Sequence, residues 1–286
     1  MLNRREFIGT TVGAGCAICS GTPGWAGQIA LAGSPSTIGE TAGCLVAPSD
    51  FTRDKLGSMG IGHTVSSFTV SGKRFQVSST SGNPHFDRAL VEALYHVSKT
   101  FDVLPTFGFI KGGNVANAFA TTTPFSPEAG DSPLPTREHG TVLFGDKMLD
   151  LMRQKGIDNP VAAVLAIIAH EFGHIVQYNY QFNGKHLIQL LTDGQPTVKL
   201  AELHADFLTG YYVGTAKRRN PDTPAASVAL AAHVIGDYQT NAPSHHGTPA
   251  ERGQAVYAGY RASWEQNLPF DQAAVAGLAH VGVIQA

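Results

Sequence analysis

The chain has 286 residues, enough to bury one sizeable hydrophobic core or two small ones. Hydrophobic residues make up 43% of it and charged residues only 15%, which excludes an intrinsically disordered protein. The formal net charge is −2, so the chain has neither the basic surface of a nucleic-acid-binding protein nor a polybasic membrane contact.

The first 32 residues have the pattern of an export signal. The pair Arg4-Arg5 precedes a weakly apolar run, rich in Gly and Ala, at residues 8–18. That run is too short to remain in a bilayer. Cleavage could follow Ala26 or Ala32, and Ala30-Leu31-Ala32 is the better match to a small-x-small site. The arginine pair resembles the twin-arginine signal, so we expect export by the twin-arginine machinery to the periplasm or the medium. No membrane span would remain after cleavage. The alternative to an export signal is an ordinary N-terminus with two basic residues.

Cysteine usage fits a mature chain without disulfides. Cys16 and Cys19 lie in the expected signal, which leaves Cys44 alone in the mature protein. A single thiol cannot form an internal disulfide, so the fold must depend on its core and on any bound metal. The residues before Cys44 match a lipid-attachment site poorly, and its modification stays open.

Residues 33–82 are interpreted as a flexible lead-in that contains a β-hairpin. The segment 33–62 is rich in Gly, Ser, Thr and Pro. Alternating residues at 65–70 and 74–77 flank a Ser-Gly-Lys turn and predict two paired strands. The main domain is expected over residues 83–286, where Asn83 caps a helix that begins with Pro84 and ends near residue 100.

The next segment predicts three short strands and a helix. Strands are expected at 106–110 and 115–120, with Gly-Gly-Asn at 112–114 as the turn between them. A proline-rich loop at 123–135 comes next, then a strand at 141–144 and a helix at 146–155 that Gly156 closes. From Pro160 onward the chain is expected to be mostly helical, with further starts at Pro224 and Pro249. The predicted fold class is therefore α+β, predominantly helical.

A cluster of polar residues interrupts an apolar helix expected at residues 162–176. His170 and His174 are four positions apart, so both imidazoles lie on one helical face and can reach one ion. Glu171 lies about 100° further round the helix, which suits contact with a water on the ion better than contact with the ion. Zinc lowers the pKa of such a water, and a carboxylate takes its proton as it attacks a carbonyl. The alternative is two core histidines that pair with a glutamate.

A catalytic zinc ion needs a third protein ligand and an open fourth position. The helix expected at 198–217 offers Glu202 and Asp206, which are four apart and share a face, whereas His204 points elsewhere. We expect Glu202 to bind zinc and Asp206 to accept a hydrogen bond from a ligand histidine, which fixes the tautomer of that ring. Two alternatives stay open: His204 as the third ligand, or a plain solvated pair of acidic residues.

Four segments occur in a set order: His-Glu-Phe-Gly-His-Ile-Val-Gln (170–177), Ala-Glu-Leu-His-Ala-Asp-Phe-Leu-Thr-Gly (201–210), Ile-Gly-Asp (235–237) and His-Gly-Thr-Pro-Ala-Glu-Arg (246–252). Together, over roughly residues 160–260, they resemble the bacterial neutral zinc metallopeptidase family of the gluzincin group. The resemblance implies a compact, zincin-like catalytic domain of the minigluzincin type. It also implies a small β-sheet whose edge strand, expected near residues 117–120, lies beside the active-site helix and receives extended substrate. Phe207 and Tyr238 depart from the family pattern, which leaves substrate preference open.

The resemblance further implies roles for a loop histidine and an acidic residue. Gluzincins use a His or Tyr on a loop to donate to the oxyanion of the tetrahedral intermediate. His246 fits this catalytic role by resemblance, with Asp237 behind it. The alternative that His246 caps the helix starting at Thr248 stays open. Three further tyrosines are alternative donors that the sequence does not rank: Tyr178, Tyr211 and Tyr212.

The sequence therefore predicts a zinc-dependent metalloendopeptidase that hydrolyses peptide bonds outside the cytoplasm. Zinc (Zn2+) would be held by His170, His174 and Glu202, and Glu171 would be the general base for a zinc-activated water. The expected partner is a peptide or protein substrate, and not nucleic acid. Two other functions stay open: a binding or assembly factor on a catalytically degenerate zincin scaffold, and a non-peptide zinc hydrolase.

Overall fold

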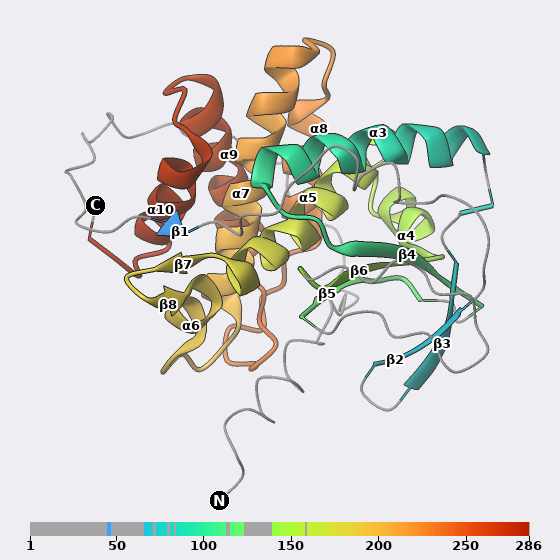
Figure 1. Ribbon diagram of the computed structural model, residues 1–286, viewed down its shortest axis with the longest axis horizontal. Coiled ribbons are helices and arrows are strands. Elements are labelled where there is room, and N and C mark those ends of the chain that lie inside the picture. The colour runs from blue at the N-terminus through green and yellow to red at the C-terminus, as the bar shows by residue number, and fades with distance from the viewer. Residues whose placement is uncertain are drawn as a thin grey trace, which may run out of the picture.

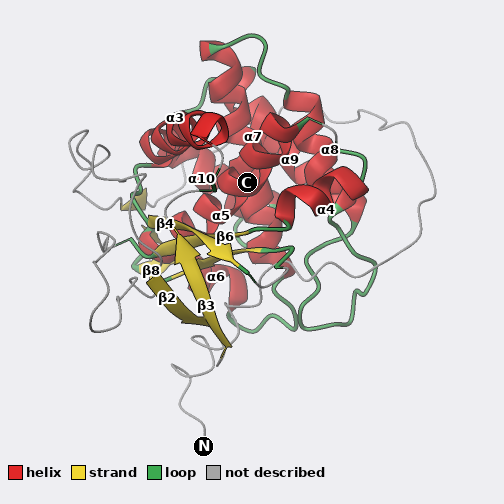
Figure 2. Ribbon diagram, turned by 90° about the vertical axis from the view of Figure 1, so that its right-hand side faces the viewer, coloured by secondary structure: helices red, strands yellow, loops and turns green. Residues whose placement is uncertain are grey.

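The computed structural model describes residues 45–46, 66–70, 73–78, 81–82, 84–112, 115–122, 139–157 and 159–285. The predicted export signal, Cys44 and the proline-rich segment 123–135 lie outside the described residues. Within them, helices gather on one side of the molecule and a five-stranded sheet lies on the other (Figure 1). In Figure 2 the strands lie below α3 (Pro84–Phe101), α7 (Lys199–Arg219) and α9 (Pro249–Trp264), whereas α6 (Leu187–Thr192) appears at the height of the strands. The chain is α+β and predominantly helical, as predicted.

The sheet is mixed, and its strand order is β2-β3-β4-β6-β5. Its strands are β2 (Ser66–Val70), β3 (Lys73–Ser78), β4 (Thr106–Lys111), β5 (Ala118–Thr121) and β6 (Thr141–Gly145). Only β4 and β6 are parallel. The predicted hairpin β2–β3 is confirmed, and β3 also pairs with β4. The domain boundary expected at residue 82 therefore passes through a continuous sheet.

The expected turn at 112–114 does not join β4 and β5 as a hairpin, because β6 lies between them. The residues after β4 instead cross the end of β6. There the Asp146 carboxylate accepts hydrogen bonds from the backbone N–H groups of Gly112 and Val115, at 3.3 Å and 3.1 Å. The crossing also needs Gly145, since an added Cβ there would collide with the carbonyl of Val115. Contacts with a later part of the chain thus decide the strand order.

Eight helices lie in the described residues, and six of them begin near starts that the sequence predicted. The helices at 187–192 and 270–280 were expected only as part of a mostly helical segment. In chain order the helices are α3 (Pro84–Phe101), α4 (Met148–Gln154), α5 (Pro160–Asn179), α6 (Leu187–Thr192), α7 (Lys199–Arg219), α8 (Ala225–Val234), α9 (Pro249–Trp264) and α10 (Phe270–His280). Asn159 Oδ1 accepts the backbone N–H of Ala162 at 3.1 Å, which caps α5. Thr248 and Glu251 form the predicted capping box of α9. A small sheet of β1 (Leu45–Val46), β7 (Gln181–Phe182) and β8 (Lys185–His186) was not predicted.

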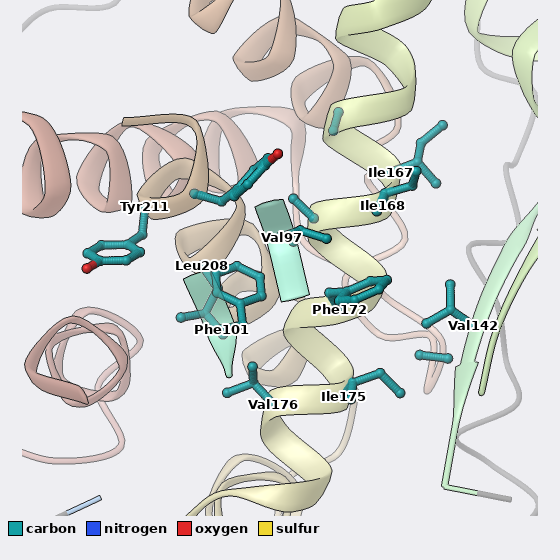
Figure 3. Packing of buried hydrophobic residues seen from close by; sticks show 14 of the residues in the cluster. Val97, Phe101, Val142, Ile167, Ile168, Phe172, Ile175, Val176, Leu208 and Tyr211 are labelled. Carbon is teal, nitrogen blue, oxygen red and sulfur yellow. The ribbon is translucent and has the colours of Figure 1, made fainter. Parts of the chain in front are cut away.

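Helix α5 is central to the core, which explains why its sequence is apolar almost all the way round (Figure 3). One side packs on the sheet, where Ile175 lies towards Val142. The other side meets α3 and α7, where Val176 lies near Phe101 and Leu208. Among the described residues, no helix is both long and apolar enough to cross a membrane.

Two close helix crossings bring the second half of the chain onto α5. A Cβ added at Gly173 of α5 would lie 3.1 Å from Ala205 Cα, so α5 and α7 approach almost backbone to backbone. Helices α7 and α9 cross more closely still, because a Cβ at Gly210 would collide with Val256 O. The same holds for Gly259, where an added Cβ would collide with a backbone carbonyl of α7. These close crossings bring together the segments of α5, α7 and α9 that carry His170, Glu202 and Arg252.

Candidate metal centre

Three side chains from two helices converge between α5 and α7. His170 and His174 share a face of α5, and Glu202 lies in the first turn of α7. One ligand atom from each side chain lies within 4.8 Å of the other two. Glu202 Oε2 is 3.2 Å from His170 Nε2, and Glu202 Oε1 is 3.4 Å from His174 Nε2. This largely buried group could hold a metal ion.

The imidazole of His170 is oriented by Asp206, as the spacing predicted. Asp206 Oδ1 lies 2.9 Å from His170 Nδ1, and an ionised carboxylate can only accept, so Nδ1 carries the proton. The Nε2 lone pair is therefore directed at Glu202. Both Glu202 and Asp206 are at least 94% buried, so the alternative of a solvated acidic pair is wrong.

Arg252 of α9, for which the sequence suggested no role, supports Asp206 from behind. Its side chain is fully buried and binds both carboxylate oxygens, with Nε 2.7 Å from Oδ2 and Nη2 2.9 Å from Oδ1. Burial would raise the pKa of Asp206, but the charge of Arg252 lowers it, and the net direction is downward. Asp206 is therefore held in the ionised form that orients His170.

His174 is oriented by Gln177, a second residue without a predicted role. His174 Nδ1 lies 3.0 Å from Oε1 of Gln177, which is one turn further along α5. His204 does not reach the site: its Nδ1 faces Gln177 and its Nε2 faces the carbonyl of Ala274 on α10. Burial lowers the pKa of His204 to about 4, so it is a neutral core histidine. The alternative of His204 as the third ligand is therefore wrong for this arrangement.

The three converging groups attract a cation. Both Nε2 atoms are acceptors when Nδ1 carries the proton, and they face carboxylate oxygens, which are acceptors too. Such contacts are stable only with a proton or a metal ion between them. Burial lowers the pKa of His170, but Asp206 and Glu202 raise it to about 10. The pKa of His174 is also raised, because Glu202 outweighs burial. The donor set therefore fits a metal cation.

Glu171 lies beside this group and not within it. The carboxyl is 5% exposed, and burial raises its pKa despite the nearby histidines, which makes it a stronger base. It borders a small pocket whose other walls are largely apolar and come from α4, α5, α7 and α8. The remaining lining residues are Met148, Met152, Ala166, Ile167, His170, Asp206, Thr209, Ala232 and Ile235.

His246 approaches the group from the loop before α9. Its ring is 4% exposed, and Nδ1 lies 3.0 Å from Glu202 Oε2 without the alignment of a hydrogen bond. Neither ring nitrogen has a hydrogen-bond partner among the described residues. The alternative role as a helix cap is wrong, because the Thr248 hydroxyl accepts the N–H of Glu251 at 3.3 Å.

Asp237 binds the backbone of the loop. The expectation that it orients the ring of His246 is therefore wrong. One carboxylate oxygen accepts the backbone N–H of His246 at 3.0 Å. The other lies 2.6 Å from Nδ1 of the buried His245 and also accepts the backbone N–H of Gln239. Asp237 and His245 thus fix the path of the loop that carries His246.

The three tyrosines considered as donors separate clearly. The hydroxyl of Tyr211 donates to the carbonyl of Leu268 at 2.9 Å, and the ring of Tyr212 packs edge-on against Phe101. The pKa of Tyr178 is raised by burial and further by the negative charges of Glu171 and Glu202. Tyr178 is therefore the tyrosine whose phenol is electrostatically coupled to the site.

Strand β5 is the edge strand of the five-stranded sheet, and it packs against α5. It pairs with β6 on one side, and among the described residues no strand pairs with its other side. Ala118 and Ala120 face the core beneath it, at 1% and 4% exposure. An edge strand therefore lies beside the helix that carries both histidines, as expected.

Comparisons of this chain with protein-family models, with curated proteins and with solved structures gave no match. The resemblance to the neutral zinc metallopeptidases therefore depends on the four sequence segments alone. The membership of that family stays a prediction, whereas the metal-binding geometry stands on its own.

Proposed function

We propose that this chain is a zinc-dependent metallopeptidase. The observation that supports this most is the convergence of two imidazole nitrogens and one carboxylate oxygen within 4.8 Å, with a buried glutamate directly beside them. Two histidines and one glutamate form a known ligand set of catalytic zinc, which leaves a coordination position open. Structural zinc sites are usually closed and rich in cysteine.

The residues of this chain divide the chemistry between them. His170, His174 and Glu202 would hold the zinc, which would supply a water of lowered pKa and a Lewis acid for the substrate carbonyl. Glu171 accepts the proton of the attacking water and passes it to the leaving amine, and its raised pKa suits both steps. His246 offers to the oxygen that becomes negative a buried ring whose two nitrogens make no aligned hydrogen bond among the described residues.

A peptide substrate is favoured by the edge of the sheet. An extended peptide can add to β5 through backbone hydrogen bonds, and β5 packs directly on α5. A non-peptide hydrolase has no need of such an edge. A degenerate binding factor has no need to bury a carboxyl beside the histidines, and burial of Glu171 opposes its ionisation.

Export is part of the proposal, although the signal lies outside the described residues. The protein would act in the periplasm or the medium after twin-arginine export. Changing Arg4-Arg5 to Lys-Lys should leave precursor inside the cell, and unchanged secretion would indicate the general secretory route.

The function is tested by chelator-sensitive cleavage of casein and of a peptide library. We expect cleavage that a chelator stops and that added zinc restores. Glu171→Gln should retain zinc and fold, yet lose about 10²- to 10⁴-fold in rate, because an amide cannot accept the proton. Cleavage by this variant at the wild-type rate would reject Glu171 as the base, and no cleavage by the metal-loaded wild type would reject the peptidase.

A further inference from the structure

A chain of buried hydrogen bonds links the C-terminal helix to the candidate metal ligand His174. It runs from the carbonyl of Ala274 on α10 to His204, then to Gln177 and finally to His174. We infer that Gln177 and His204 are positioning residues that fix the tautomer of His174, with α10 as the anchor. The role they serve depends on the metal site of the proposed function.

The direction of each hydrogen bond follows from groups that can only accept. Gln177 Nε2 lies 2.7 Å from the carbonyl of Ala201, so this end of the amide is the NH₂ group. Its other end is then the oxygen, which lies 3.0 Å from His174 Nδ1. His174 must therefore donate from Nδ1, and its Nε2 keeps the lone pair that a metal needs.

The second hydrogen of the Gln177 amide points at His204 Nδ1, 3.2 Å away. That nitrogen accepts, so the ring proton of His204 is on Nε2 and is donated to the carbonyl of Ala274 at 3.1 Å. A flipped Gln177 would face the Ala201 carbonyl with its own oxygen and present an NH₂ group to His174. Two backbone carbonyls therefore enforce one arrangement of all three side chains.

Packing prevents these side chains from adopting another arrangement. Gln177 and His204 are both 0% exposed. A Cβ added at Gly277 of α10 would lie 2.9 Å from His204 Cδ2 and 3.0 Å from its Nε2. Helix α10 thus packs closely against the ring of His204 at Gly277, where even one added carbon would displace it. This helix lies outside residues 160–260, so the role of α10 does not follow from the sequence resemblance.

The two histidines are oriented by chemically different means. An ionised carboxylate supported by Arg252 orients His170, whereas a neutral amide orients His174. Loss of a residue that orients a metal ligand typically weakens metal binding 10- to 100-fold. Gln177 is therefore expected to affect affinity for zinc directly, beyond any effect on folding.

The test measures zinc affinity of the full chain by competition with a chromophoric chelator, alongside the melting temperature of the metal-free protein. Gln177→Leu should weaken zinc binding about 10- to 100-fold and alter the absorption spectrum of bound Co²⁺. Gln177→Glu keeps an acceptor for His174 but removes the NH₂ group that Ala201 and His204 face, so it should retain more affinity than Gln177→Leu and lower the melting temperature. Gly277→Ala should weaken binding by a smaller factor, because it displaces only His204.

Ser263→Ala is the matched control, since Ser263 is buried and hydrogen-bonded to Thr215 and Arg218 at the far end of α7. It should lower the melting temperature and leave zinc affinity unchanged. Wild-type affinity in folded Gln177→Leu would overturn the inference. If that variant does not fold, Gly277→Ala with a lowered melting temperature and unchanged affinity would overturn it instead.

The inference and the proposed function fail in different ways. A wild-type protein that binds zinc through His174 but cleaves no peptide rejects the peptidase and leaves the role of Gln177 intact. A wild-type protein that cleaves peptides, with zinc affinity unaffected by Gln177→Leu, rejects the positioning role and leaves the peptidase intact. A protein that binds no zinc rejects both.

Discussion

Replacing Arg252 by methionine should be one of the most destabilising single changes in this chain. The guanidinium and the Asp206 carboxylate are at most 1% exposed and share two hydrogen bonds of 2.7 Å and 2.9 Å. A hydrogen bond to a charged group contributes about 1.5–3 kcal/mol, so two contribute about 3–6 kcal/mol. Removal of one partner of a buried ion pair costs about 3–5 kcal/mol, which agrees. The free energy of unfolding of a domain is typically about 5–15 kcal/mol, so the variant should be only marginally stable.

The assay is urea unfolding with chelator present, so that metal binding adds nothing to the measured stability. Arg261→Met on the same helix is the control, because Arg261 also lies 2.7 Å from a carboxylate but that pair is 30% and 46% exposed. The control should cost no more than about 1 kcal/mol. The double variant with Asp206→Asn should cost less than the sum of the single changes by about 1–3 kcal/mol. A cost below about 1 kcal/mol for Arg252→Met, or simple additivity, would refute the argument.

Three further predictions concern the site and its loop. Glu202→Ala should remove most bound zinc in elemental analysis, and full retention in the folded variant would place the third ligand elsewhere. His246→Ala should lower kcat by about 100-fold with KM and zinc content nearly unchanged, whereas Thr248→Ala should lower the unfolding free energy by about 1 kcal/mol and spare kcat. An active His246→Ala would end its catalytic role. Burial raises the pKa of Asp237, but hydrogen bonds from His246, His245 and Gln239 lower it overall. Because the pKa in the folded state lies below the unfolded value of about 3.9, ionised Asp237 stabilises the folded protein above that pH. This contribution is lost as the pH falls through the folded-state pKa. The melting-temperature difference between wild type and Asp237→Asn should therefore shrink from pH 7 to pH 3, and a constant difference would contradict this reasoning.

The residues of the candidate metal centre were predictable because their geometry is local. His170, Glu171 and His174 occupy one helix, and the helical repeat alone sets their directions. Glu202 and Asp206 share a face of another helix for the same reason. Their pairing with α5 needed the close crossing at Gly173, which spacing along the chain does not reveal.

Two residues that orient these groups were missed because contacts with other helices set the directions of their side chains. Gln177 and Arg252 stand in the quoted segments, but their roles depend on the packing of α7 against α5 and α9. The strand order failed for a related reason. Hydrogen bonds from Gly112 and Val115 to Asp146, at the end of a later strand, outweigh the local turn sequence. A side chain aligned by tertiary contacts leaves no periodic signal.

The backbone-to-backbone crossings of α5, α7 and α9 have a consequence for metal exchange. Because Gly173, Gly210 and Gly259 already hold the helices together, the ligand geometry does not need the ion to assemble it. Loading and removal of the metal should then be an ordinary ligand equilibrium on a folded protein. If the protein binds a metal here, as proposed, it should lose the ion to a stronger chelator without denaturing, and it should take the ion up again in the folded state.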